Sequence, residues 1–228
     1  LATKISFMNE ISQICEFTDV DVENVRKGIG SDSRIGYSFI YPGCGYGGSC
    51  FPKDVRAIIQ TAKNYNFDPI VLSSVEMRNK AQKNILYKKI KQKFGQNLTN
   101  RFFSIWGLSF KPGTDDMREA PSKYLIKSII KSGGKVRIYD PIAMDSAKKE
   151  FTEYELKSIF FCSSEYDVLN NSDALVLVTE WGQFRQPNFE KIIEKLKNPI
   201  IFDGRNQYNP QYLKNIGIEY YGIGRTNL

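Results

Sequence analysis

The sequence lacks histidine entirely, and this absence limits the chemistry available to it. Ser-His-Asp hydrolysis, Cys-His proteolysis and histidine-ligated zinc are excluded within these 228 residues, because no other side chain titrates unperturbed near neutral pH. Acid–base steps must therefore use carboxylates, lysines, thiols or tyrosines. Four cysteines are too few for a disulfide scaffold, and none forms a Cys-x-x-Cys pair, so no metal site is expected.

The sequence also lacks long apolar runs. None approaches the roughly 20 residues that span a bilayer, and the first residues do not have the order of a signal peptide. The composition, with 41% apolar and 25% charged residues, is that of an ordinary globular protein. We therefore expect a cytoplasmic protein without a membrane segment. The chain opens without Met, and apolar residues recur at helical spacing from Ile5, which suggests that it begins inside a helix.

Positive charge is concentrated in one segment. The chain has 32 basic and 25 acidic residues, a net charge of +7, and seven basic residues without an acidic one lie between 78 and 93. A nucleic-acid-binding protein is one interpretation. The same segment carries an apolar stripe, formed by Ile85, Leu86, Ile90 and Phe94. We therefore interpret most of the basic residues as the solvated face of an amphipathic helix and expect no nucleic-acid partner.

Two kinds of periodicity divide the chain near residue 97. The first part predicts helices over 20–27, 52–65 and 68–94, with Pro52 at the first helical position and Asp68 as an N-cap. The second part alternates helices with strands, the strands being expected over 102–106, 136–139, 174–178 and 199–202 and the helices over 121–132 and 189–196. This alternation predicts a parallel sheet covered on both faces. The fold class is therefore α/β, with a helical domain over 1–97 and a doubly wound, Rossmann-like domain over 98–228.

A glycine-rich segment from Tyr41 to Asp54 is the most informative stretch. Its four glycines allow backbone N–H groups to approach an anionic ligand closely. The segment runs into a helix start, where the helix dipole and Lys53 would both favour the reactive thiolate of Cys50. Asp54, one turn further, could move a proton. A structural alternative remains, because glycines also make turns and a lone cysteine often packs as a small apolar residue.

Basic residues follow two of the expected strands. Lys111 and Arg118 come after the first strand, and Arg205 comes after the last one, close to Asp203. Ligands of parallel sheets bind at the carboxyl ends of the strands, so these cations would meet an anion such as a nucleotide diphosphate. The segment after the first strand is not Gly-x-Gly-x-x-Gly, which argues against dinucleotide binding there. Lys111 could equally be an exposed loop cation, and Arg34 lies in a polar loop.

Five segments taken together resemble the nucleotide-sugar 6-dehydrogenases, most closely those that oxidise UDP-glucose. The segments are GYGGSCFPKD at 45–54, GLSFKPGTDDMRE at 107–119, IYDP at 138–141, TEW at 179–181 and FDGR at 202–205. The resemblance runs in order over nearly the whole chain. It implies three parts in the family: an N-terminal Rossmann domain for NAD, a central helical dimerisation domain and a C-terminal α/β domain for the nucleotide sugar. This sequence resembles the last two.

The resemblance also implies a reaction and roles for residues. The reaction is the NAD-dependent oxidation of UDP-glucose to UDP-glucuronate in a homodimer, with a thiohemiacetal and then a thioester on Cys50. Asp54 would assist proton transfer and water attack, while Lys53 and Arg118 would lie near NAD. The implied substrate-binding residues are Arg34 from the partner subunit, Tyr41, Gly43, Gly45, Tyr46, Gly47, Phe110, Lys111 and Arg205.

Some features of the family are missing from these 228 residues. They are the Rossmann glycine fingerprint, a Thr and a Glu near the chemistry, and a Lys and an Asn expected just ahead of Leu1. We therefore expect NAD to be held mainly by an N-terminal domain and the isolated chain to be inactive. Two alternatives stay open: a dehydrogenase of GDP-mannose or another nucleotide sugar, and a stand-alone nucleotide-sugar-binding or dimerisation module.

Overall fold

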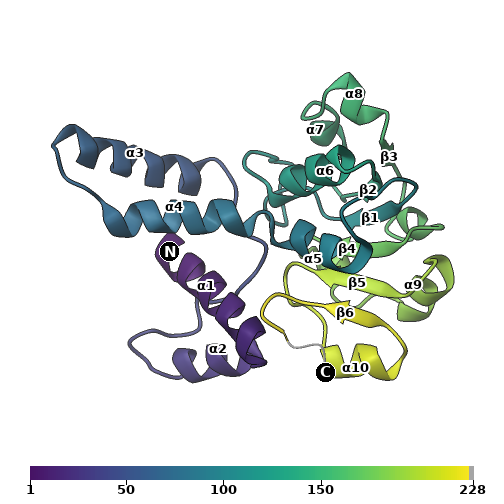
Figure 1. The fold of residues 1–228 in the computed structure, drawn as a ribbon, viewed down its shortest axis with the longest axis horizontal. Coiled ribbons are helices and arrows are strands. Elements are labelled where there is room, and N and C mark those ends of the chain that lie inside the picture. Colours follow the sequence, from purple (N-terminus) through teal and green to yellow (C-terminus); the bar gives the residue numbers. More distant parts are fainter. Residues whose placement is uncertain (226–228) are drawn as a thin grey trace.

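The computed structural model describes residues 1–225 and consists of a helical region beside an α/β region (Figure 1). The helical region begins with α1 (Ala2–Thr18) and α2 (Val22–Gly30), followed after a long loop by α3 (Cys50–Asn64), α4 (Ile70–Gln82) and α5 (Ile85–Phe94). Helix α3 lies alongside α4, and α4 packs on α1. Met8 and Cys15 of α1 form a small core with Val22 and Ile40.

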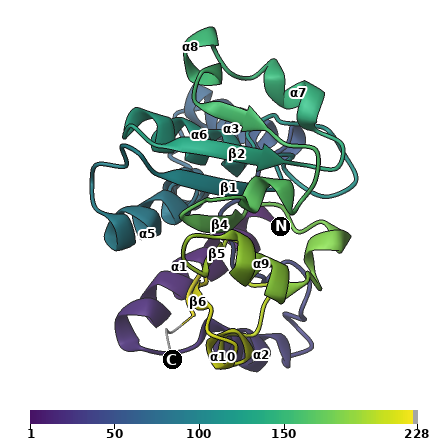
Figure 2. The same ribbon diagram turned by 90° about the vertical axis from the view of Figure 1, so that its right-hand side faces the viewer.

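The α/β region contains one sheet of six parallel strands. The strands are β1 (Phe102–Trp106), β2 (Lys135–Tyr139), β3 (Ile159–Phe161), β4 (Ala174–Leu177), β5 (Ile200–Asp203) and β6 (Glu219–Tyr221). Figure 2 shows them stacked in the order β3-β2-β1-β4-β5-β6, which is the order of dinucleotide-binding Rossmann folds. In such a sheet the connections reverse direction between β1 and β4, and ligands bind there.

Helices cover both faces of this sheet. The connecting helices are α6 (Pro121–Lys131), α7 (Met144–Lys148), α8 (Glu153–Leu156), α9 (Phe189–Lys195) and α10 (Pro210–Asn215), with 3-10 turns η1 (Asp167–Leu169) and η2 (Gly182–Phe184). Successive strand residues point to opposite faces, so Phe103 and Ile105 join the core under α5 and α6, whereas Trp106 packs toward α9 and α10. The predicted doubly wound α/β fold is confirmed.

Two predicted helix starts and one predicted helix length are wrong. Helix α3 begins at Cys50, so Pro52 is its third residue; the first-turn N–H groups have no partner inside the helix, and a proline costs little there. Helix α4 has Pro69 as its N-cap without a capping side chain, so Asp68 does not cap it. The expected helix over 68–94 is interrupted after Gln82, which allows α5 to pack on the sheet while α4 packs on α1.

The strands β3 and β6 were not expected from the sequence. Each has three residues and lies at an edge of the sheet, so neither forms an apolar run long enough to recognise. Helix α5 packs against the sheet, because Ile85, Leu86 and Ile90 lie in the same hydrophobic core as Phe103. The division into domains 1–97 and 98–228 stays a prediction, and its last residues, 226–228, lie outside the described part.

The long loop between α2 and α3 lies between the two regions. The backbone N–H of Cys44 donates to the carbonyl of Gly204 at 2.9 Å, and that of Gly48 donates to the carbonyl of Arg118 at 2.8 Å. The glycine-rich segment therefore crosses the carboxyl edge of the sheet, where β1, β4 and β5 end. Within residues 1–225, no helix has both the length and the apolar character needed to cross a membrane.

Candidate functional site

Buried amide side chains hold the glycine-rich loop in place. Asn9 Oδ1 accepts from the N–H of Gly43 at 2.8 Å, and Gln82 Nε2 donates to the carbonyl of Gly43 at 2.7 Å. Asn79 bonds both backbone groups of Tyr46, at 2.9 and 3.1 Å. Sequence reasoning missed all three amides. The sequence feature that could have identified them is a polar residue at a position of α1 or α4 where the helical pattern expects a buried apolar side chain.

Glycine is required where this loop meets the segment after β1. A Cβ atom at Gly47 would lie 2.5 Å from the carbonyl oxygen of Glu119, which is backbone and cannot move aside easily. Gly48 has φ +90°, and a Cβ there would lie 2.8 Å from the ring of Phe110. Two predicted site residues, Gly47 and Phe110, are thus in close contact. The glycine-rich loop therefore packs against the Phe110 side chain at Gly47 and Gly48.

A buried carboxylate shapes the turn that carries Arg205. Asp203 at the end of β5 accepts hydrogen bonds from the backbone N–H groups of Arg205, Gln207 and Tyr208 and from the Tyr220 hydroxyl, at 2.7 to 3.1 Å. Burial raises the pKa of Asp203 despite these donors. Asp203 therefore fixes the turn through protein donors.

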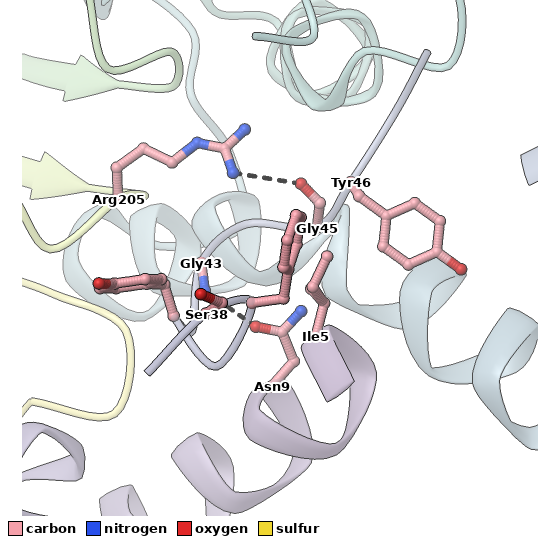
Figure 3. A pocket seen from close by; sticks show the side chains of 9 residues that line it. Ile5, Asn9, Ser38, Gly43, Gly45, Tyr46 and Arg205 are labelled. Atoms are coloured by element: carbon pink, nitrogen blue, oxygen red, sulfur yellow. Dashed lines mark hydrogen bonds between the residues drawn. The ribbon is translucent and has the colours of Figure 1, made fainter. Parts of the chain in front are cut away.

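The Arg205 guanidinium points back from this turn to the glycine-rich loop (Figure 3). Its Nε donates to the Val178 carbonyl at 2.7 Å and lies 3.1 Å from a Glu180 carboxylate oxygen, while Nη1 contacts the Gly45 carbonyl at 3.4 Å. Burial alone would lower the pKa of Arg205, but nearby acidic groups such as Glu180 outweigh it and raise the pKa. Arg205 therefore stays charged beside the loop.

A cleft of ≈ 370 Å³ opens at this contact, within the size range of small-molecule sites. We call it the Arg205 cleft; its lining includes Ile5, Asn9, Ser38, Phe39, Tyr41, Gly43, Gly45, Tyr46 and Arg205. The cleft brings together Tyr41, Gly43, Gly45, Tyr46 and Arg205, all predicted substrate-binding residues. In Figure 3 the Tyr46 ring points away from Arg205. Burial raises the pKa of its hydroxyl to about 12.

Two predicted substrate-binding cations do not line the Arg205 cleft. Lys111 is exposed, and its Nζ lies 5.5 Å from the Phe110 ring centroid. Arg34 is 87% exposed and forms a two-pronged ion pair with Asp32 in the loop after α2. The structure of one subunit therefore leaves Arg34 away from the cleft, and its predicted role across a dimer stays a prediction.

A second cleft, of ≈ 560 Å³, lies where the glycine-rich loop enters α3. We call it the Lys53 cleft; it is lined by Gly48, Ser49, Lys53, Arg56, Arg118, Glu119 and Lys123. Lys53 and Arg118, the two predicted NAD-side residues, thus share one surface. Four cations against one carboxylate make the lining basic. Arg118 is held by Asp116 through hydrogen bonds of 2.8 to 3.1 Å, which raise its pKa.

Cys50 differs from the other three cysteines in exposure. It is exposed at the first residue of α3, with its Sγ 3.6 Å from the Ser49 hydroxyl. Cys15 and Cys44 are 3% and 1% exposed, and burial raises the pKa of their thiols and of Cys162. Asp54 follows in the first turns of α3, with its carboxylate 3.8 Å from Lys53 Nζ. The four thiols therefore include a single exposed one, and it adjoins the Lys53 cleft.

A buried ion pair joins the helical region to the segment after β1. Lys83, with a side chain only 4% exposed, donates from Nζ to Glu119 at 2.6 Å, and the Tyr124 hydroxyl donates to the same carboxylate at 2.7 Å. Burial would raise the pKa of Glu119, but these two hydrogen bonds and the charges of Lys83 and Arg56 hold it at about 2. The pair therefore ties the helical region to Glu119, which lines the Lys53 cleft.

Asp140 organises the carboxyl ends of three strands. It follows β2 and accepts hydrogen bonds from the N–H groups of Leu108 and Ala143 and from the indole of Trp181, at 2.7 to 3.0 Å. An acidic residue in this position binds the ribose of NAD in dinucleotide-binding folds. Here the carboxylate is buried and occupied by protein donors.

The basic run over 78–93 is largely neutralised by partners distant in sequence. Four of its seven cations form ion pairs, namely Arg78 with Glu10, Lys83 with Glu119, Lys89 with Glu16 and Lys93 with Glu219. The expected solvated face is therefore wrong for Lys83, which is buried. These four ion pairs reduce the uncompensated positive charge of the segment.

Comparison with known proteins covers both regions. The model of the UDP-glucose/GDP-mannose dehydrogenase family, central domain, matches residues 1–81, and the model of the same family's UDP binding domain matches residues 104–210. The chain belongs to the UDP-glucose/GDP-mannose dehydrogenase family. The predicted resemblance is thereby confirmed, and the family's two matched domains contain the glycine-rich loop and Arg205 respectively.

Individual relatives in this family match almost the whole chain. It is 49% identical over 226 residues to UDP-glucose 6-dehydrogenase of Pseudomonas aeruginosa and 41% identical over 225 residues to that of Bacillus subtilis. Each alignment covers 99% of this chain and 50% of the relative. The solved UDP-glucose dehydrogenase from Pyrobaculum islandicum is similar with a TM-score of 0.85 and 26% identity, over 99% of this chain and 48% of that one. The chain spans about half the length of the curated relatives it matches.

Proposed function

We propose that this chain is the central and nucleotide-sugar-binding part of a UDP-glucose 6-dehydrogenase. The reaction is the four-electron oxidation of the C6 alcohol of UDP-glucose to the carboxylate of UDP-glucuronate. One observation carries the proposal: the exposed Cys50 thiol lies at the end of a loop that Arg205 contacts from the UDP-binding domain. The family membership supports the same assignment.

The Arg205 cleft is the proposed site for the nucleotide sugar. Arg205 supplies a fixed positive charge, and a guanidinium binds phosphate oxygens through two N–H groups. The Tyr41 ring lines one part of the cleft, and Gly43 and Gly45 let a ligand approach the backbone. Lys111, exposed after β1, is the second proposed cation for the diphosphate. Phe110, Tyr46 and Gly47 shape the loop that continues to Cys50.

Cys50 is the proposed nucleophile. After the first oxidation its thiolate adds to the C6 aldehyde, forming a C–S bond, and the resulting oxyanion takes a proton to give a thiohemiacetal. This adduct restores a carbon that bears both hydrogen and hydroxyl, so a second hydride and a proton can leave and yield a thioester. Water then attacks the carbonyl carbon, the C–S bond breaks, and the thiol and the carboxylate are released. Asp54, one helical turn after Cys50 in α3, is the proposed group that orients that water and accepts its proton.

The Lys53 cleft fits the cofactor that this chemistry needs. When bound, NAD accepts one hydride in each oxidation, so two molecules are reduced per sugar. Lys53 and Arg118 would hold its phosphates, because they lie in a basic cleft next to Cys50. We propose that the remaining contacts come from an N-terminal domain, and that the 228 residues alone reduce no NAD.

A homodimer is the proposed assembly. Helix α1 exposes Phe7, and Ile70 and Val71 of α4 lie beside it at the surface. Ile14 and Phe17 continue the exposed apolar surface along α1. A second copy would bury these side chains and would bring Arg34 to the neighbouring subunit's site. Light scattering of the purified protein tests the state directly.

The identity of the sugar needs a test of its own, because the family also contains GDP-mannose dehydrogenases. The test is NADH formation by the full protein that carries this chain, with UDP-glucose, GDP-mannose and UDP-N-acetyl sugars offered separately. We expect two NADH per UDP-glucose from the unmodified protein, and neither a second NADH nor UDP-glucuronate from Cys50→Ser. One NADH and free aldehyde would refute the thiol mechanism. A preference for GDP-mannose would change the proposed substrate from UDP-glucose to GDP-mannose. UDP binding without oxidation of any sugar would favour a stand-alone binding module.

A further inference from the structure

The chain that leaves β4 contacts the segments that leave the strands on either side of it. In the sheet β4 lies between β1 and β5 (Figure 2). Lys111 follows β1 and Arg205 follows β5, so the two proposed diphosphate-binding cations flank the end of β4. We call Thr179, Glu180 and Trp181, which follow β4, the TEW segment. The proposed function gives this segment no role.

The end of β4 holds Arg205 from one direction. Arg205 Nε donates to the Val178 carbonyl at 2.7 Å and lies 3.1 Å from a carboxylate oxygen of Glu180. The N–H groups of a guanidinium lie in one rigid plane, so partners at Nε set the direction in which the two terminal nitrogens point. Val178 and Glu180 therefore fix the orientation of Arg205 at the Arg205 cleft.

Thr179 holds the segment that follows β1. Its side chain is fully buried, and its Oγ1 donates to the carbonyl of Ser109, two residues before Lys111, at 2.6 Å. The two segments also pack closely, because a Cβ atom at Gly107 would lie 2.4 Å from the Cβ atom of Thr179. The position of Thr179 therefore determines how the chain runs from β1 to Lys111.

Trp181 acts on the same segment through Asp140. The indole Nε1 of Trp181 donates to Asp140 Oδ2 at 3.0 Å. The same oxygen accepts from the N–H groups of Leu108 at 2.7 Å and Ser109 at 3.2 Å. The Ser109 hydroxyl donates to the Lys111 carbonyl at 2.9 Å. The N–H, the carbonyl and the hydroxyl of Ser109 are thus all bonded, which restricts the backbone just before Lys111.

We propose that the TEW segment is a positioning element that sets the spacing of Lys111 and Arg205, so that both cations bind the diphosphate of one nucleotide sugar. Groups that are held in place before the ligand arrives lose less conformational entropy on binding, which raises affinity. This inference rests on the proposed function, since it assumes that Lys111 and Arg205 bind the diphosphate. It makes Thr179 and Trp181 positioning residues that act through Lys111, and Glu180 one that acts through Arg205.

The substitutions Thr179→Val and Thr179→Ser separate the hydroxyl from the shape of the side chain. Valine keeps the shape of threonine but cannot donate to Ser109, whereas serine keeps the donor. In calorimetric titrations of the full protein with UDP, we expect Thr179→Val to bind about fivefold more weakly and Thr179→Ser to bind within about twofold of the unmodified protein. Unchanged affinity in Thr179→Val, or an equal loss in both variants, would overturn the inference.

A double-mutant cycle with Lys111→Ala shows whether Thr179 acts through Lys111. Lys111→Ala alone should weaken UDP binding about tenfold, because it removes one of the two cations. Adding Thr179→Val to Lys111→Ala should then weaken binding by less than about twofold, since the positioned group is already gone. The full loss of Thr179→Val in the Lys111→Ala background, or unchanged affinity in Lys111→Ala alone, would overturn the inference.

The matched control is Ser104→Ala in β1. Ser104 is also fully buried, and its hydroxyl donates to the Val168 carbonyl at the same distance, 2.6 Å. Within residues 1–225, neither Ser104 nor Val168 lines the Arg205 cleft or the Lys53 cleft. We expect Ser104→Ala to lower the melting temperature and leave UDP affinity unchanged. A loss of affinity equal to that of Thr179→Val would overturn the inference, whereas failure of the unmodified protein to bind UDP would refute the proposed function instead.

If Thr179→Val does not fold, Trp181→Phe is the second variant. It removes the N–H that donates to Asp140, so UDP binding should weaken while Lys111 is present and stay unchanged in the Lys111→Ala background. Its control is Trp106→Phe, the same change at the other tryptophan, whose Nε1 donates to the Glu165 carbonyl at 2.7 Å. Equal losses of affinity in the two variants, or no loss in Trp181→Phe, would overturn the inference and leave the proposed function standing.

Discussion

The ion pair between Lys83 and Glu119 should stabilise the protein by an amount that depends on pH. The pKa of Glu119 is about 2, against 4.5 for an ordinary glutamate, a difference of 2.5 units because 4.5 − 2 = 2.5. At about 1.4 kcal/mol per unit this corresponds to roughly 3.5 kcal/mol, which solvent screening of the partly exposed carboxylate reduces to about 2 kcal/mol. Because the folded-state pKa is depressed, this stability is present above about pH 4.5 and is lost as the pH falls toward 2.

The substitution Glu119→Gln tests this reasoning. It leaves Lys83 charged and buried without its partner, so urea unfolding at pH 7 should show about 2 kcal/mol less stability than the unmodified protein. At pH 3 about half of that difference should be gone, because Glu119 is then almost fully protonated in the unfolded state but still largely ionised in the folded one. The control Glu219→Gln removes a more exposed pair with Lys93 and should cost at most about 1 kcal/mol. Equal stability of Glu119→Gln and the unmodified protein at pH 7 would refute the account.

Three further predictions concern the loop and its clefts. Iodoacetamide should alkylate Cys50 before the other three cysteines, as peptide mass spectrometry would show; first labelling elsewhere would contradict the exposure described. Gly47→Ala should destabilise the protein by about 1–3 kcal/mol, since its Cβ would lie 2.5 Å from the Glu119 carbonyl, and an unchanged melting temperature would argue against that contact. Arg205→Lys keeps the charge but loses the planar guanidinium, so calorimetry should show UDP binding about tenfold weaker, and unaltered affinity would remove Arg205 from the site.

The sequence was sufficient where the structural cause is local. The strand at 102–106 is found at the predicted residues, because five successive apolar or small residues lie in the middle of the sheet. Helix α6 begins at Pro121 as predicted, since proline fits the first helical position. The sequence also predicted that Cys50 lies where a glycine-rich loop meets a helix, although α3 begins at Cys50 itself and two residues before the expected Pro52.

Features that depend on distant partners could not be predicted in this way. Helix α5 separates from α4 because Ile85 and Leu86 pack on the sheet, and the helical periodicity alone does not show that surface. Lys83 looked like one of several solvated cations until Glu119, 36 residues away in sequence, was found beside it. Asn9 was missed as well, because its bond to the loop depends on Gly43 being brought onto α1 by the fold.

The central claim is that Cys50 carries the half-oxidised hexose, and trapping the adduct tests it most directly. The Asp54→Asn variant of the full protein should hydrolyse the thioester slowly, so acid quenching during reaction with UDP-glucose and NAD should preserve it. We predict that mass spectrometry will find the nucleotide-linked uronyl group on the peptide that contains Cys50. Formation of UDP-glucuronate by a Cys50→Ser variant at an undiminished rate, or an adduct on another residue, would contradict the account.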